Sequence, residues 1–133
     1  MNARARTTLR RRVVAAALAF PGAHEDFPWG EQVAKVEKKI FAFLGTEHSA
    51  TPGMAVKLPD SHDVALSLPG VSPCGYGLAR SGWVRVEFDH PDCPGVDLLL
   101  DWLDESYRAV APKRLVLELD RVKRGRDTAG SPH

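Results

Sequence analysis

One stretch of the chain, Leu18 to Lys57, decides the fold, and it reads LAFPGAHEDFPWGEQVAKVEKKIFAFLGTEHSATPGMAVK. Its first signature, Phe20-Pro21-Gly22, predicts the end of a helix, because proline and glycine both interrupt helical backbone. Its second, Phe27-Pro28-Trp29-Gly30, predicts a short strand or edge segment, since proline cannot donate within a central ladder. We interpret these two signatures as the hinge that turns the first helix onto a sheet, with Trp29 as a packing anchor.

The residues on either side of the hinge predict a helix before it and strands after it. Lys39–Phe43 has β-type composition. We expect Phe41 and Phe43 on one face and Lys39 on the other. Residues 45–53 predict a loop, and residues 54–58 another strand. The helix before the hinge follows from apolar residues at helical spacing, namely Leu9, Val13, Ala16, Ala17 and Phe20.

The second half of the chain predicts two further helices and two paired strands. A short helix opens at Asp60 or Ser61 and closes at Pro69-Gly70. Strands are expected at Cys74–Ala79 and Gly82–Phe88. The helix after them has a continuous apolar stripe: Val96, Leu99, Leu100, Leu103, Tyr107 and Val110. Pro112 ends that helix and opens a last short one through Leu119.

Together these segments predict an α+β fold, a two-layer sandwich. The order is helix, three strands, helix, two strands, helix, with an antiparallel sheet of about five strands and helices on one face. We expect one domain over residues 1–120 and a basic, flexible tail over residues 121–133.

The charge is unevenly distributed, although the net charge is only +1. The first twelve residues hold five arginines and no acid, and residues 121–126 hold four more cations, so the middle of the chain is acidic. Basic ends favour contact with a polyanion, or alternatively serve as solvated termini that keep the protein soluble.

The two cysteines, Cys74 and Cys93, are too few for a disulfide framework and favour a reducing, cytoplasmic location. Arg10-Arg11-Arg12 and the apolar residues 13–20 imitate a secretion signal, but the apolar part is short and lacks a clear cleavage site, so we interpret it as helix. His90 and Cys93 lack the partner pair of a metal site, and no spanning segment is present. We therefore expect no metal, no cofactor and no membrane partner.

The signatures resemble those of the MmcQ/YjbR family of small bacterial proteins over about residues 7–119. Besides the hinge, the matching segments are Lys39–Ala42, Val56–Leu58, Tyr76-Gly77, Gly82–Val86 and Ser106-Tyr107. The resemblance implies a fold like that of the type III secretion chaperones and a DNA-binding role. It supplies no catalytic motif to carry over onto this chain. Phe20 stands where the family usually has leucine, and the basic ends lie outside the shared pattern.

The candidate site is the sheet face that the helices leave open. Strand alternation predicts Lys39, Lys57, Trp83 and Arg85 on that face, where an aromatic ring can stack on bases and cations can neutralise phosphates. Trp83 packed against a loop, or marking a protein contact, explains the same residues. The function we expect is a non-catalytic nucleic-acid-binding accessory protein, a monomer or weak dimer; the alternative is a protein-binding module.

Overall fold

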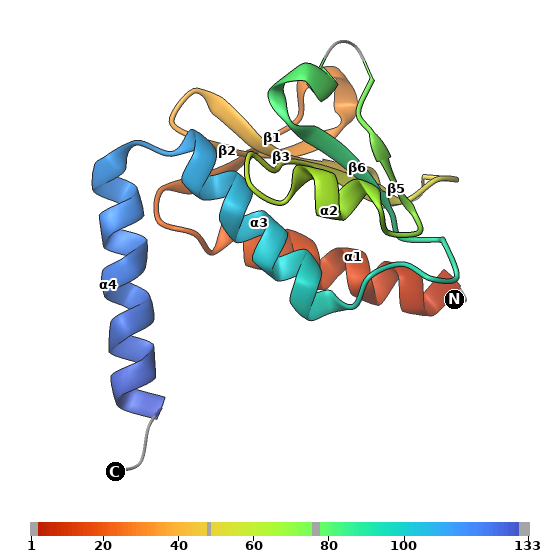
Figure 1. The fold of residues 1–133 in the computed structure, drawn as a ribbon. Coiled ribbons are helices and arrows are strands. Elements are labelled where there is room, and N and C mark those ends of the chain that lie inside the picture. The colour runs from red at the N-terminus through yellow and green to blue at the C-terminus, as the bar shows by residue number, and fades with distance from the viewer. Residues whose placement is uncertain (1–2, 48, 76–77, 131–133) are drawn as a thin grey trace.

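The computed structural model describes residues 3–47, 49–75 and 78–130 and has two layers. One layer is a six-stranded antiparallel sheet with the strand order β1-β2-β3-β4-β6-β5. The other layer consists of α1, α2 and α3, which lie together on one face of the sheet (Figure 1). The predicted α+β sandwich is confirmed, with a sheet slightly larger than expected.

The strands are short. Strands β1 to β4 pair in chain order, whereas β4 pairs next with β6, and β5 lies at the edge of the sheet. Their bounds are β1 Ala23–Asp26, β2 Gln32–Val36, β3 Lys39–Gly45, β4 Gly53–Lys57, β5 Val71–Pro73 and β6 Trp83–Glu87. Two short 3-10 turns, η1 (Pro28–Gly30) and η2 (Leu78–Ser81), lie on the side of the sheet away from the helices (Figure 1).

The helices are α1 (Ala3–Leu18), α2 (His62–Leu66), α3 (Val96–Val110) and α4 (Lys113–Gly130). α3 has the bounds that its apolar stripe predicts. α4 is longer than the short helix expected through Leu119, and residues 121–130, expected as a tail, continue it. No helix within the described ranges is long and apolar enough to cross a bilayer.

The core lies between the sheet and α3. The ring of Tyr107 stacks on Phe20 at 4.7 Å and meets Phe41 edge-on at 5.3 Å. The Tyr107 hydroxyl donates to the carbonyl of Pro21 at 2.6 Å, which ties the hinge to α3. Ser106 is fully buried; its Oγ donates to the Phe41 carbonyl and accepts from the Lys57 backbone N–H. Tyr107 thus joins α3 to the hinge, and Ser106 joins α3 to β3 and β4.

Two irregularities in the pairing of β2 with β3 overturn the expected face assignment. Ala34 pairs with Ala42 while Lys35 pairs with Ile40, so Phe41 is an extra residue, a β-bulge. The bulge turns Phe41 toward the helices, where it contacts Tyr107, whereas Phe43 points to the opposite face. The prediction that Phe41 and Phe43 share a face is therefore wrong.

Two segments differ from their predicted structure. Phe27–Gly30 is not a strand: Pro28–Gly30 forms the turn η1, and the strands are β1 before it and β2 after it. The predicted strand Cys74–Ala79 is wrong: β5 covers Val71–Pro73 and ends before it, and Leu78–Ser81 forms the turn η2. Tyr76 and Gly77 lie outside the described residues.

α4 touches the rest of the domain through its first turns. Leu119 belongs to the core, and Leu115 packs against the hinge at Gly22. A Cβ at Gly22 would lie 3.0 Å from Cδ1 of Leu115, and Gly22 has φ +71°, which a side chain disfavours. Beyond Lys123, which pairs with Asp104 of α3, α4 extends away from the body of the domain (Figure 1).

Candidate functional site

Trp83 lies on β6 but is not exposed, contrary to expectation. Its side chain is only 7% exposed and packs edge-on against Phe43, with ring centroids 5.3 Å apart. The segment after β5 lies alongside, since the Cys74 N–H donates to the Trp83 carbonyl. The sheet face opposite the helices therefore has its own small apolar cluster, and the indole of Trp83 offers no surface on which a base could stack.

Lys57 and Arg85 do lie on the same sheet face as Trp83. In the β4–β6 ladder Lys57 pairs with Trp83, and Ala55 pairs with Arg85. Cross-strand partners share a face in an antiparallel pair, so alternation correctly grouped these three predicted residues. Both cationic side chains are half-buried. Their contact with nucleic acid stays a prediction.

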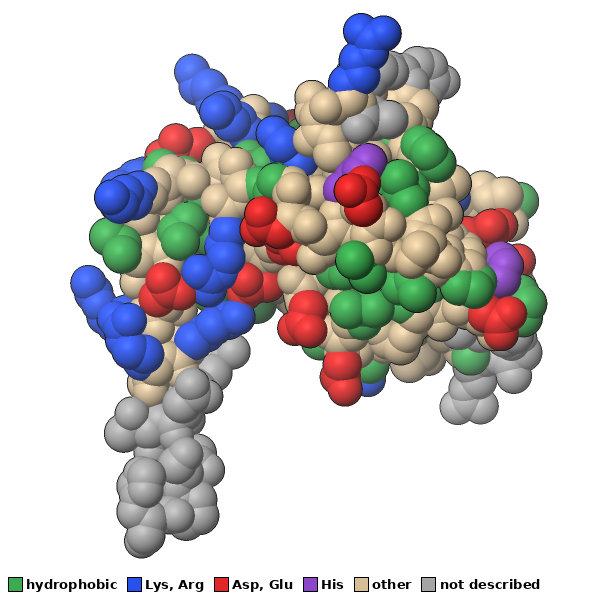
Figure 2. Space-filling view, viewed as in Figure 1, with side chains coloured by type: hydrophobic (Ala, Val, Ile, Leu, Met, Phe, Trp, Pro, Cys, Tyr) green, Lys and Arg blue, Asp and Glu red, His purple; other side chains and the backbone are tan. Residues whose placement is uncertain are grey.

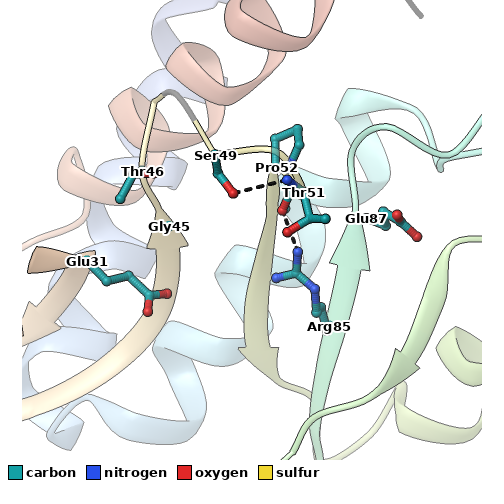
Figure 3. A pocket seen from close by; sticks show the side chains of 9 residues that line it. Glu31, Gly45, Thr46, Ser49, Thr51, Pro52, Arg85 and Glu87 are labelled. Atoms are coloured by element: carbon teal, nitrogen blue, oxygen red, sulfur yellow. Dashed lines mark hydrogen bonds between the residues drawn. The ribbon is translucent and has the colours of Figure 1, made fainter. Parts of the chain in front are cut away.

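Arg85 lies in a cavity of about 420 Å³ at one end of this face (Figure 3). Its Nη2 donates to the Thr51 carbonyl at 2.6 Å, and its guanidinium lies against Gly53, where a Cβ would be 3.1 Å from Nη2. Glu31 and Glu87 line the same cavity. The surroundings of Arg85 therefore have mixed charge and do not form a continuous basic strip with Lys57.

Lys39 is separated from the other predicted residues. It pairs with Val36, which belongs to the helix-side core, and with Val110 and Pro112 it lines a cavity of about 530 Å³ at the end of α3. The bulge at Phe41 shifts the alternation between Lys39 and the rest of β3. The structure thus assigns Lys39 to a different surface from Lys57, Trp83 and Arg85.

That second surface is strongly basic. We call it the α4 basic surface, and it consists of Lys38 and Lys39 at the β2–β3 turn with Lys113, Arg114, Arg121 and Arg124 on α4. All six side chains are exposed, and Figure 2 shows Lys and Arg side chains gathered on α4 and at the neighbouring turn. An ion pair between Arg114 and Glu37 at 2.5 Å connects the helix to the turn.

On the inner side of α4, by contrast, the basic side chains are paired with carboxylates. Asp104 of α3 pairs with Arg108 and Lys123, and Asp120 of α4 pairs with Arg108 at 2.8 Å. The hydrogen bond from Arg108 holds the pKa of Asp120 below its ordinary value. These pairs help fix α4 against α3, so the cations of the basic surface point the other way, toward solvent.

A third exposed feature is the segment Phe27–Glu31, which we call the aromatic loop. Trp29 is 87% exposed and Phe27 is 53% exposed, so Trp29 is not the packing anchor that the sequence predicted. Trp29 has φ +57°, a left-handed conformation that is rare for a bulky residue. Hydrogen bonds to Asp26 from the Phe27 N–H and from Lys35 hold the pKa of Asp26 below its ordinary value.

A comparison with protein families identifies the family to which this chain belongs. The model of the YjbR family matches residues 18–109, from the end of α1 to the end of α3. The chain belongs to the YjbR family. No curated protein matches the chain. The family match includes the hinge, the aromatic loop and the Arg85 cavity, whereas α4 lies beyond it.

The exposure of the aromatic loop was missed at the level of sequence, and the α4 basic surface was anticipated only as a basic end of the chain, although each leaves a signal there. Arg114, Arg121 and Arg124 follow the spacing i, i+7 and i+10, which places them on one helix face. Glu25 and Asp26 precede the two aromatic residues of the loop, and Glu31 follows them. Charged residues this close in sequence favour an exposed segment over a buried one.

Proposed function

We propose that this YjbR-family protein is a non-catalytic, cytoplasmic accessory protein that binds nucleic acid weakly and without sequence preference. It acts as a monomer or weak dimer and without a cofactor. The observation that carries the proposal is the α4 basic surface, whose exposed cations are gathered on one side of the domain. The resemblance to MmcQ/YjbR proteins, which implies a DNA-binding role, points in the same direction.

The two faces of α4 have different roles in this proposal. The inner face, with Leu115 and Leu119, attaches the helix to the core. The outer face presents Arg114, Arg121 and Arg124, interrupted by the exposed Leu117. A helix anchored on one face and cationic on the other can lie along a phosphate backbone, releasing counterions as its cations contact phosphates.

Ion pairing leaves enough cations free for such a contact. Lys123 and Arg114 are engaged with Asp104 and Glu37. Among the described residues, the ion pairs do not include Lys38, Lys39, Lys113 or Arg121. Contacts from these side chains go to phosphates, which carry no sequence information, so the binding is expected to be nonspecific.

The proposal is tested with a fluorescein-labelled DNA duplex, by anisotropy at several salt concentrations. We expect measurable binding at low salt and a linear fall of log K with log salt. The triple substitution Lys113→Ala, Arg121→Ala, Arg124→Ala should reduce that slope by about 3, because roughly one counterion is released per lost contact.

A matched control removes three positive charges elsewhere: Arg12→Ala, Lys57→Ala, Arg85→Ala. If this control loses as much affinity as the α4 triple variant, the binding surface is the sheet face or simply the net charge, and the α4 assignment fails. Absence of binding to the duplex at low salt would remove nucleic-acid binding altogether.

A further inference from the structure

We propose that the aromatic loop, Phe27–Glu31, binds a basic segment of a partner protein, with a cationic side chain of the partner stacked on the indole of Trp29. This surface is separate from the α4 basic surface and does not depend on nucleic-acid binding. The proposal rests on the exposure, the conformation and the charge of the loop.

The exposure of Trp29 has no explanation in the fold. At 87% it exceeds that of every other exposed large hydrophobic residue within the described ranges. Phe27, two residues earlier, is 53% exposed, so the two aromatic side chains come from one short turn. Tryptophan is among the residues most enriched at the energetic centres of protein interfaces.

The conformation of Trp29 argues in the same direction. Trp29 has φ +57° and ψ +20°, and Gly30 follows with φ +79°. Glycine or asparagine adopts this backbone more readily than tryptophan does. Neither packing nor backbone preference therefore accounts for a tryptophan here. A strained, exposed residue held by its surroundings is characteristic of a functional position.

Hydrogen bonds fix the loop in this conformation. The Gly30 N–H donates to the Phe27 carbonyl and the Glu31 N–H to the Pro28 carbonyl, both at 3.2 Å. The carboxylate of Asp26 accepts from the Phe27 N–H at 2.8 Å. Pro28 further restricts the turn. The aromatic side chains are thus presented on a preorganised backbone, which lowers the entropy lost on binding.

The charge of the loop decides the chemistry of the partner. Residues 24–31 contain Glu25, Asp26 and Glu31 and no lysine or arginine. Lys35 of β2 pairs with Asp26 at 3.2 Å, so Glu25 and Glu31 supply the uncompensated negative charge among the described residues of this segment. Carboxylates beside the loop repel phosphates, so the loop is a poor place for nucleic acid. They attract lysine and arginine, whose cationic groups bind favourably over the face of an indole ring.

Glu31 extends the acidic surface into the neighbouring cavity. Its side chain comes from the end of the loop and lines the cavity that also contains Glu87 and Arg85 (Figure 3). A partner segment whose cation lies on Trp29 can therefore place an adjacent polar group in this cavity, between carboxylates and a guanidinium.

The test uses a fluorescein-labelled synthetic peptide of alternating arginine and glycine, with an uncharged peptide of alternating glutamine and glycine as its reference. We expect the arginine peptide to bind the full chain at low salt and the glutamine peptide not to bind. Trp29→Gly should weaken binding about tenfold, as loss of a cation–π contact implies, and leave the melting temperature unchanged or raised, since glycine accepts the left-handed backbone.

Matched variants separate the loop from general acidity. Glu31→Gln should weaken binding severalfold, whereas Asp63→Asn, an exposed carboxylate on α2, and Val64→Ala, an exposed apolar residue there, should leave it unchanged. The proposal is overturned if the arginine peptide does not bind, if Trp29→Gly binds as the native chain does, or if Asp63→Asn weakens binding as much as Glu31→Gln. Self-association that Trp29→Gly abolishes, measured by sedimentation, would assign the loop to a second copy and also overturn it.

Discussion

The α4 basic surface and the aromatic loop are both exposed, but they differ in charge, chemistry and relation to the family. The first consists of lysine and arginine side chains on α4, beyond the family match, together with Lys38 and Lys39 at the β2–β3 turn, which lie within it. The second consists of two aromatic residues among carboxylates, within the match. Because a polyanion favoured by one is repelled by the other, a single ligand cannot explain both. The acidic, aromatic surface thus lies within the family match, whereas most of the basic surface lies on α4, beyond it.

The largest effect expected is on the free energy of unfolding when Trp102 and Trp29 are each replaced by alanine. The comparison tests whether the aromatic loop contributes to folding stability. Trp102 on α3 is 3% exposed, so Trp102→Ala should lower the free energy of unfolding by about 3–5 kcal/mol. Trp29→Ala should change it by less than about 1 kcal/mol, since an exposed side chain loses little on truncation. Urea unfolding measures both. A cost at Trp29 that approaches the cost at Trp102 would return Trp29 to the role of packing anchor.

The next effect separates the two surfaces by their ligands. The substitution Lys113→Ala, Arg121→Ala, Arg124→Ala should weaken binding to a DNA duplex about a hundredfold at low salt, if each contact contributes about 1 kcal/mol. Binding of the arginine peptide should stay the same or strengthen, because the protein becomes more acidic. Trp29→Gly should give the reverse pattern in the same two assays. If either variant lowers the affinity for the duplex and for the peptide by the same factor, the two surfaces are not independent.

A smaller effect concerns the core on which both surfaces depend. Ser106→Ala removes the buried hydroxyl that links the Phe41 carbonyl and the Lys57 N–H. Leaving these backbone groups without that partner should cost about 1–3 kcal/mol of stability. Thermal unfolding measures the loss, while binding of duplex and peptide below the transition should be unchanged. Altered affinity for one ligand alone would show that Ser106 acts on that surface directly.

The smallest effect is the pH dependence of the aromatic loop. The pKa of Asp26 lies below its ordinary value of 3.8, chiefly because the Phe27 N–H donates to the carboxylate. A lowered folded-state pKa means that the stabilisation is present above the unfolded-state value and is lost as the pH falls through the folded-state value. An NMR titration of the carboxyl carbon should give a pKa below 3.8. Asp26→Asn should abolish this part of the acid dependence, and an ordinary pKa would contradict the hydrogen bond.

The parts of the fold that could be predicted from the sequence are those with a marked periodicity. α3 has an apolar stripe bounded by Gly95 and Pro112, and its predicted ends agree with the structure. β3 was predicted as a strand, but residues 40–44 are all apolar and provide no polar marker of the face on which each side chain lies. The bulge at Phe41 could therefore not be predicted from the sequence. For the same reason the sequence did not show that Lys39 and Lys57 lie on different surfaces.

The site was harder to predict because exposure depends on residues distant in sequence. Alternation placed Trp83 on the correct face, yet its burial depends on Phe43, across the sheet. Trp29 was expected to be buried because tryptophan usually is, and only the turn around it reveals otherwise. In both cases the sequence singled out the tryptophan. Whether a ligand can reach that tryptophan depends on the side chains and the backbone around it.

The contact between Gly22 and Leu115 connects the part of the chain within the family match to α4, which lies beyond it. Gly22 belongs to the hinge that identifies the family, and its missing side chain leaves the space that Leu115 of α4 occupies. A Cβ at Gly22 would lie 3.0 Å from Cδ1 of Leu115, so a side chain in the hinge would press directly on α4. A substitution at Gly22 would therefore shift α4 together with its core residue Leu119, and would change where the basic side chains of that helix are presented.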